Sequence, residues 1–250
     1  MLFAYLHQIY RLMRFYLFAA LLLANLRFVS AQSSQNNTNF QLWLDPTINY
    51  NLCAKTRLSS DIYYRTKLND IGWRQTVLRP GISHTISKRV TVLGGVGWFR
   101  LEDHDLEPRN EIRYWAGLQY THHLFWKVDL QHYFRAEERM FYQKGADNYQ
   151  NLRLRYRLGL SYPLKEKDAS GKSAQLALQY EPFLTTNSGH LSDQFFNTER
   201  LYFGVSNSLS PAIRVDVYYM LQWGRTLKAE QFHFTDHIIQ LKFIYTINPL

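Results

Sequence analysis

The chain has little of what disulfide-bonded, disordered and collagen-like proteins need. Its only cysteine, Cys53, has no partner for an internal disulfide. Glycine and proline are scarce, at 12 and 7 of 250 residues, while aromatic residues make up 16%. This balance excludes a collagen-like chain and argues against disorder. Beyond residue 31 no apolar run approaches the roughly 20 residues of a membrane-spanning helix, so the classes that remain are a globular domain and a membrane protein built of strands.

The first 31 residues have the layout of a secretory signal peptide. Arg11 and Arg14 precede an apolar run at 15–26, and residues 29–31, Val-Ser-Ala, form a small-residue cleavage pattern. The run is too short to cross a bilayer as a helix and is followed by Arg27, which favours a cleaved signal over a transmembrane anchor. Export of the chain is therefore predicted.

The mature chain that this cleavage leaves is basic. The whole sequence carries a formal charge of +9, and removing the three arginines of the first 31 residues leaves 26 basic against 20 acidic residues, or +6. We expect residues 32–38 to be a linker and residues 39–250 to form one domain, with Met1 or Met13 as the start. A basic chain suits nucleic acid or an anionic membrane surface, and export argues against nucleic acid as a partner.

Two-residue alternation of apolar and polar side chains dominates the mature chain, whereas helical periodicity is nearly absent. In the stretch NLRLRYRLGLSYPL, residues 151–164, leucine and tyrosine alternate with Arg153, Arg155 and Arg157. The alternating segments exceed the roughly 5–6 residues of a common globular strand and suit a tilted transmembrane strand of about 9–11 residues. The predicted strands are 39–50, 56–67, 73–86, 90–101, 110–121, 124–137, 149–162, 174–184, 196–208, 212–224 and 236–248.

These segments predict an all-β fold, namely an antiparallel transmembrane β-barrel of 10 to 12 strands with short periplasmic turns and longer external loops. Eleven segments are counted, yet bacterial single-chain barrels have even strand numbers. We therefore expect that one segment divides into two strands, that one lies outside the barrel, or that the N-terminal segment runs inside the lumen.

A soluble β-sandwich would also alternate, but the placement of aromatic and charged residues favours a barrel in lipid. Residues typical of interfacial girdles lie near the ends of the apolar faces: Tyr50, Tyr64, Tyr120, Tyr162, Tyr180, Trp223 and Tyr245. The opposite faces carry charges of both signs, which a barrel directs into its lumen. Together with the export signal, these patterns predict the bacterial outer membrane as the location.

The charges of the polar faces form the candidate functional site, with Glu138 as a further nearby acid. We expect a lumen charge network of Arg57, Asp61, Arg65, Arg79, Glu111, Arg113, Asp129, Arg135, Glu137, Arg153, Arg155, Arg157, Glu181 and Arg200. An unpaired charge inside a narrow barrel is costly, so one interpretation is a structural network in which acids neutralise the arginines. The other is an anion-attracting pore or binding site, because arginine suits carboxylate and phosphate and charge rings set selectivity.

Several short motifs, taken in order, resemble a family of Gram-negative outer-membrane proteins catalogued as a domain of unknown function. They are LWLDPTINYNL, YYR, LRPGISHTISKRVTVLGGVGWF, EIRYW, HYFRAEERM, LRLRYRLGLSYPL, YEPFL and ERLYFGV. The resemblance covers about 42–245, almost the whole mature chain. It implies an outer-membrane barrel and supplies no activity.

An outer-membrane enzyme acting on lipid or lipopolysaccharide is the alternative function. Ser188, His190 and Asp193 share one predicted loop and are the candidates for such chemistry. Ser83 and His84 are adjacent in a predicted strand, so their side chains point to opposite faces and cannot form a catalytic pair. We assign no catalytic residue, no metal site and no cofactor.

The sequence thus predicts an outer-membrane barrel whose lumen is lined by arginine, aspartate and glutamate, and which serves as a small-solute or anion channel or as a structural barrel. Its expected partners are outer-membrane lipid and lipopolysaccharide, the barrel assembly machinery and a small anionic solute. If Glu111, Glu137 or Glu181 neutralises the arginines of 153–157, the lumen is plugged; otherwise these arginines line an anion path.

Overall fold

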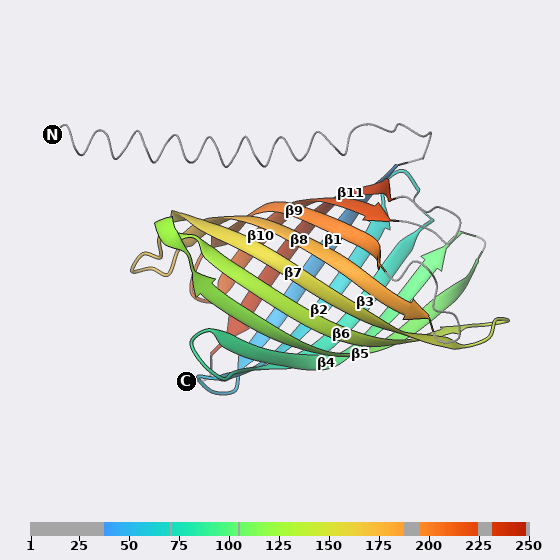
Figure 1. The fold of residues 1–250 in the computed structure, drawn as a ribbon, viewed down its shortest axis with the longest axis horizontal. Helices are drawn as coiled ribbons and strands as arrows, with labels where there is room; N and C mark the ends of the chain where they lie inside the picture. Colours follow the sequence, from blue (N-terminus) through green and yellow to red (C-terminus); the bar gives the residue numbers. More distant parts are fainter. Residues whose placement is uncertain (1–37, 71, 105, 188–195, 225–231, 249–250) are drawn as a thin grey trace. The chain divides into compact units, whose positions relative to one another are not determined.

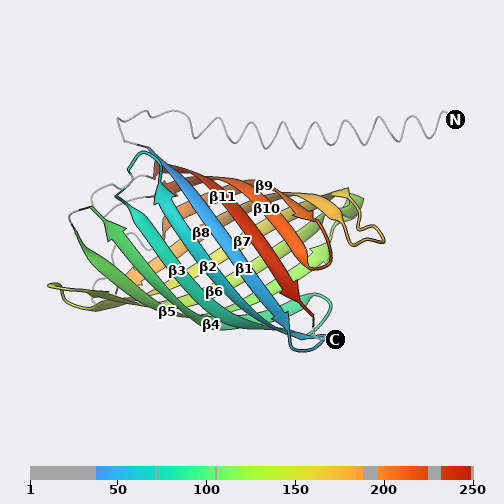
Figure 2. The same cartoon turned by 180° about the vertical axis from the view of Figure 1, so that it is seen from behind.

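The computed structural model describes residues 38–70, 72–104, 106–187, 196–224 and 232–248. They form one closed barrel of eleven strands (Figures 1 and 2), which confirms the predicted all-β barrel of 10 to 12 strands. The strands are β1 (Asn39–Asn51), β2 (Thr56–Lys67), β3 (Arg74–Thr85), β4 (Val90–Asp103), β5 (Leu106–His123), β6 (Asp129–Gln143), β7 (Tyr149–Lys165), β8 (Ser173–Asn187), β9 (Phe196–Ser208), β10 (Ile213–Gly224) and β11 (His233–Ile247). The predicted signal peptide, 1–31, and the predicted linker as far as residue 37 lie outside the described residues.

The barrel closes between its first and last strands, which form the only parallel pair among the described strands. The pairing runs from Asn39 opposite Asp236 to Tyr50 opposite Ile247. With an odd number of strands the first and the last run in the same direction, because each hairpin between them reverses the chain. The even count expected of a bacterial barrel is therefore not found: no predicted segment divides, and the N-terminal segment is a wall strand rather than a lumen segment.

For the same reason the barrel begins and ends at opposite rims. The N-terminal rim, where β1 begins, carries the connections β2–β3, β4–β5, β6–β7, β8–β9 and β10–β11, and the C-terminal rim, where β11 ends, carries the other five. At the N-terminal rim, the hairpin strands extend into segments with the polar composition of long loops, since β4 ends at Asp103, β5 begins at Leu106, β6 ends at Gln143 and β7 begins at Tyr149 (Figure 1).

The start of β6 differs from the prediction. Alternation predicts a strand from Leu124, but the chain forms a 3-10 helix at Phe125–Lys127 and β6 begins at Asp129. Trp126 and Lys127 adopt left-handed φ values of 60° and 62°. Phe125 and Trp126 are 69% and 40% exposed. Their apolar side chains continued the alternating pattern in the sequence, but they lie at the C-terminal rim, where aromatic side chains of membrane proteins are common.

The wall is apolar outside, and inside it carries buried charged residues together with aromatic and aliphatic ones, unlike the apolar core of a soluble β protein. Leu152, Leu154 and Tyr162 on the outer face of β7 are exposed, whereas Glu137 and Glu181 on the inner face are fully buried. Exposed members of the predicted girdle are Tyr50, Tyr64, Tyr162, Tyr180 and Tyr245. This distribution is that of membrane β-barrels. Within the described residues no helix is long and apolar enough to cross a membrane.

Two facing glycines make room for an aromatic ring at the inner wall. Gly81 of β3 is paired with Gly95 of β4, and a Cβ on Gly95 would lie 2.3 Å from the Pro80 oxygen and 2.9 Å from Cζ2 of Trp115. The indole of Trp115 therefore lies against the backbone of these strands, an arrangement in which a ring covers the gap that glycine leaves in a sheet. The ring supports Arg135 of β6, whose Cζ is 4.1 Å from its centroid.

Candidate functional site

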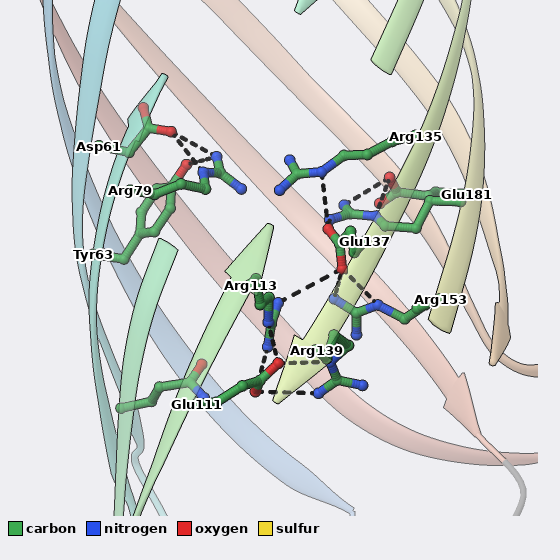
Figure 3. A network of polar contacts seen from close by, with 12 residues as sticks. Asp61, Tyr63, Arg79, Glu111, Arg113, Arg135, Glu137, Arg139, Arg153 and Glu181 are labelled. Atoms are coloured by element: carbon green, nitrogen blue, oxygen red, sulfur yellow. Dashed lines mark hydrogen bonds and ion pairs between the residues drawn. The ribbon is translucent and has the colours of Figure 1, made fainter. Parts of the chain in front are cut away.

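Glu137 of β6 is the centre of an ion-pair network in the lumen (Figure 3). Its carboxylate is fully buried and has four arginine side chains within 4.0 Å. Arg153 donates to Oε2 from Nε at 2.8 Å and from Nη2, and Arg155 donates to Oε1 from Nη1 at 2.9 Å. Nε of Arg135 lies 2.9 Å from Oε1, and Nη1 of Arg113 lies 3.9 Å from Oε2. Charge-assisted hydrogen bonds of this kind offset the cost of burying a carboxylate.

Glu111 and Glu181 extend the network in two directions. Glu111 of β5 accepts from both nitrogens of the Arg113 fork and, at 2.6 and 3.2 Å, from Arg139. Glu181 of β8 accepts from Arg155 at 2.8 and 3.2 Å and from the hydroxyl of Tyr202 at 2.5 Å. We call the set of Glu111, Arg113, Arg135, Glu137, Arg139, Arg153, Arg155 and Glu181 the Glu137 network. Its five arginines and three glutamates leave a formal excess of two positive charges.

The register between strands sets these contacts. Glu137 is opposite Arg153 and Arg135 is opposite Arg155 in the β6–β7 pair. Directly opposite side chains have Cβ atoms about 4.5–5.5 Å apart, so the pairing brings acid and base within reach inside the barrel. A slip of one residue would turn the whole charged face outward, which means that the network also defines the register.

Aromatic rings lie beneath the guanidinium groups of the network. The distances from Cζ to the ring centroid are 3.5 Å for Arg113 over Phe99, 4.1 Å for Arg135 over Trp115, 4.6 Å for Arg139 over Phe141 and 4.8 Å for Arg155 over Phe183. Stacking of this kind is favourable and fixes the plane of the guanidinium. The arginines are therefore held in place by the wall behind them as well as by the carboxylates.

A smaller cluster lies on the side of β2 and β3. Arg79 donates to Oδ2 of Asp61 from Nε at 3.0 Å and from Nη2 at 2.6 Å, and also to the hydroxyl of Tyr63. Figure 3 shows Arg79 and Arg135 pointing toward one another. Nε and Nη2 of Arg135 are buried and find no acceptor with hydrogen-bond geometry among the described residues, although Nε is at ion-pair distance from Glu137. Two guanidinium groups thus approach each other inside the barrel from β3 and β6.

The structure divides the predicted lumen residues into three groups. The Glu137 network and the pair of Asp61 and Arg79 bring most of them together. Arg65, Arg157 and Arg200 have no carboxylate oxygen within 4.0 Å in the described part of the chain. Two residues lie apart, at the strand ends of the C-terminal rim: Arg57 donates to Oδ1 of Asn51 at 2.7 Å, and Asp129 pairs with His123.

The arginine ladder of β7 is therefore mostly neutralised. Arg153 and Arg155 make ion pairs with Glu137, and Arg155 also pairs with Glu181. Arg157, nearer the C-terminal rim, lies over the ring of Tyr133 with Cζ 5.1 Å from the centroid. Of the two alternatives set out from the sequence, the pairing around Arg153 and Arg155 matches the plug.

Sequence reasoning missed three inner residues and misplaced one. Arg139 belongs to the Glu137 network, and the buried Asp45 and Asp236 lie on the inner faces of β1 and β11. The signal that would have found Arg139 is the continuation of the β6 alternation beyond Glu137, since residues two apart share a face. Glu138, expected to be a nearby acid of the network, is instead exposed on the outer face of β6.

The residues considered for catalysis do not form a described site. His84 is exposed, with Nδ1 2.9 Å from Oγ1 of Thr56, and the side chain of its neighbour Ser83 points to the opposite face of β3, as expected from the strand geometry. The loop with Ser188, His190 and Asp193 lies outside the described residues.

A closed barrel with an apolar outer wall and a charged lumen defines a class, the outer-membrane-like β-barrels. Within it, the chain belongs to the family described as protein of unknown function (DUF2490), which matches residues 40–233. No curated protein sequence matches the chain.

Two solved structures of outer-membrane proteins are similar to the chain at low identity. The β domain of the Bordetella autotransporter BrkA is 11% identical, with a TM-score of 0.43, over 78% of this chain and 82% of that one. The siderophore receptor PirA from Pseudomonas aeruginosa is 11% identical, with a TM-score of 0.30, over 74% of this chain and 35% of that one.

Proposed function

We propose that the chain is an outer-membrane β-barrel whose lumen is closed at the level of the Glu137 network, so that it is a structural barrel rather than an open diffusion pore. The observation that carries this proposal is the complete burial of Glu137 and Glu181, at 0% exposed surface. A side chain that lines a water-filled channel touches that water and keeps exposed surface. A carboxylate that has no exposed surface inside a barrel is enclosed by protein on every side.

The size of the barrel supports the same conclusion. A barrel of about 8 strands is filled by its own side chains, whereas one of about 16–18 strands encloses an aqueous channel. Eleven strands are closer to the first case, and arginine is among the longest side chains available to fill the space. The side chains of Arg79 and Arg135, which point toward one another in Figure 3, are only 17% and 4% exposed.

The location and partners are part of the proposal. The exposed apolar outer face and its tyrosines suit a membrane, and the expected export signal suits the outer membrane. Outer-membrane lipid, lipopolysaccharide and the barrel assembly machinery are the partners that this location implies. The excess of positive charge in the Glu137 network means that a small solute which does enter is favoured to be an anion.

Conductance in planar bilayers tests the closure. We expect no channel steps from the wild-type protein, and steps from the double variant Arg79→Ala with Arg135→Ala, which shortens the two side chains that meet inside the barrel. Arg214→Ala is the matched control, because Arg214 pairs with Asp216 near the C-terminal rim and its loss should leave the lumen closed. Steady steps of porin size from folded wild-type protein would refute the proposal.

A further inference from the structure

A second group of inner side chains meets around the indole of Trp43, nearer the N-terminal rim. Cζ of Arg65 from β2 lies 3.9 Å from a ring centroid of Trp43, and Cζ of Arg200 from β9 lies 5.0 Å from it. In the barrel β9 is separated from β1 by β10 and β11, so Arg200 reaches past two strands to the ring. Two like charges are thus gathered on one aromatic side chain that is itself buried.

Neither guanidinium forms an ion pair with a carboxylate of the described chain. Nη1 of Arg65 donates to the amide oxygen of Gln75 at 3.0 Å, and Nε of Arg200 donates to the amide oxygen of Gln222 at 2.7 Å. No carboxylate oxygen of a described residue lies within 4.0 Å of either group. Nε of Arg65 is buried and has no acceptor among the described residues, a donor that costs free energy unless something accepts from it.

The acids of this region hydrogen-bond to groups other than these two arginines, and Oδ1 of the buried Asp45 has no hydrogen-bond partner among the described residues. Asp236 accepts from the amides of Gln41 and Gln222, each at 2.6 Å. Glu181 is bonded to Arg155 and to the hydroxyl of Tyr202. Asp45, two residues along β1 from the indole, accepts from the amide of Gln240. These acids lie beyond ion-pair distance of Arg65 and Arg200, so among the described residues both guanidinium groups hydrogen-bond only to neutral amides.

The position of these residues leaves them close to one opening of the barrel. Trp43 is the fifth residue of β1 and Arg200 the fifth of β9, while Arg65 is two residues from the end of β2. All three strand ends lie at the N-terminal rim. At about 3.3 Å of rise per residue, the group lies about 7–13 Å along the strands from that rim.

We propose that Arg65, Arg200 and Trp43 form a binding site for a small oxyanion, a carboxylate or a phosphate, that enters from the N-terminal rim. Free guanidinium donors from two sides bind the planar or tetrahedral oxygens of such a group. Both guanidinium groups lie over the same buried indole, and a buried, apolar setting strengthens the attraction between charges. The site is independent of the closure proposed above, because binding needs access from one rim only and no path through the Glu137 network.

Isothermal titration of the folded full barrel in a low-chloride detergent buffer tests the site. The two probes are inorganic phosphate and benzoate, since one represents phosphates and the other organic carboxylates. Saturable heat with one or both probes is the expected result, and the stronger of the two identifies the source of the anion. A folded barrel migrates differently on a denaturing gel before and after boiling, and this difference verifies that the protein used is folded. If such protein gives no saturable heat with either probe, the proposal is overturned.

Two variants assign the binding to this place. Arg200→Gln should weaken binding about tenfold or more, the loss expected when one charge-assisted contact disappears, whereas Arg214→Gln near the C-terminal rim should leave it unchanged. Trp43→Phe should remove the change in tryptophan fluorescence that accompanies binding in the wild type, because both guanidinium groups lie over the Trp43 ring. Equal binding by wild type and Arg200→Gln, or a fluorescence change that survives in Trp43→Phe, places the anion elsewhere and overturns the proposal.

Discussion

Replacing Glu137 with glutamine tests whether the lumen network stabilises the barrel. The substitution keeps the size of the side chain and removes its charge. Arg113, Arg135, Arg153 and Arg155 then surround a neutral amide. The amide keeps one oxygen as an acceptor, while its NH₂ group faces guanidinium groups that can only donate.

The expected loss is large because Glu137 is fully buried and holds several arginines at once. Removing one partner of a buried ion pair costs about 3–5 kcal/mol, since the remaining charge stays buried without compensation. With a urea slope of about 2–3 kcal/mol/M for a chain of this size, the unfolding midpoint should fall by about 1–2.5 M. The network holds an excess of cations already, so no other acid in it can replace the lost charge.

Urea titration of the folded barrel in detergent, followed by tryptophan fluorescence, measures this shift. Glu138→Gln is the matched control, because Glu138 is the next residue and is exposed on the outer face. Its free energy of unfolding should stay within about 0.5 kcal/mol of wild type. The double variant of Glu137→Gln with Arg153→Gln should lose less than the sum of the two single variants, since the residues share an ion pair.

The reasoning is refuted if Glu137→Gln and Glu138→Gln have the same midpoint. That result would mean that water or a bound ion replaces the lost carboxylate at no cost, and hence that the lumen is hydrated at this level. An additive double variant would likewise show that Arg153 and Glu137 do not interact in the folded barrel.

Two further predictions concern the wall and a turn. Gly95→Ala should lower the free energy of unfolding by about 1–3 kcal/mol in the same urea assay, because its Cβ would meet the Pro80 oxygen at 2.3 Å, whereas Gly94→Ala, with its nearest atom at 3.4 Å, should be tolerated. In the β7–β8 turn, Asp168 accepts from Lys165, from Ser170 and from the amide of Lys172, and these bonds lower its pKa. A lowered pKa stabilises the turn above the unfolded value of about 3.9 and loses the effect as the pH falls below it. Asp168→Ala should therefore speed hydrogen exchange at the Lys172 amide at pH 7. The difference in exchange rate between the variant and the wild type should become smaller toward acid pH. An unchanged exchange rate at pH 7 would contradict the assignment.

The fold could be predicted from the sequence because alternation is a local property. Each barrel strand alternates over more than ten residues. The apolar face of a strand can therefore be predicted from its own sequence, without information about the neighbouring strand. The start of β6 could not be predicted, since Phe125 and Trp126 continue the apolar pattern although the backbone turns there. The odd strand number was present in the count of segments but conflicted with the general rule for bacterial barrels.

The site could be predicted only in part, because it depends on contacts between strands. Alternation places Arg153, Arg155 and Arg157 in the lumen, but which carboxylate each one meets depends on register. Glu137 meets Arg153 because the two residues are opposite each other in the β6–β7 pair. The meeting of Arg200 with Trp43 depends on the closure of the barrel and on side chains that reach past two strands, and no local pattern reports it.

The inner arginines differ in what balances their charge, and this difference separates a structural role from a binding role. Arg155 has two carboxylates and a ring around it, so its charge is used within the protein and no donor geometry is left for a ligand. Arg200 has an amide and two rings, which hold its position without an ion pair to a described carboxylate. Burying a charge without an ion pair costs free energy. Proteins retain such destabilising residues mainly at functional sites. The arginines that are paired with carboxylates lie around Glu137, where we propose that the lumen is closed, whereas Arg65 and Arg200 lie nearer the rim from which we propose that an anion enters.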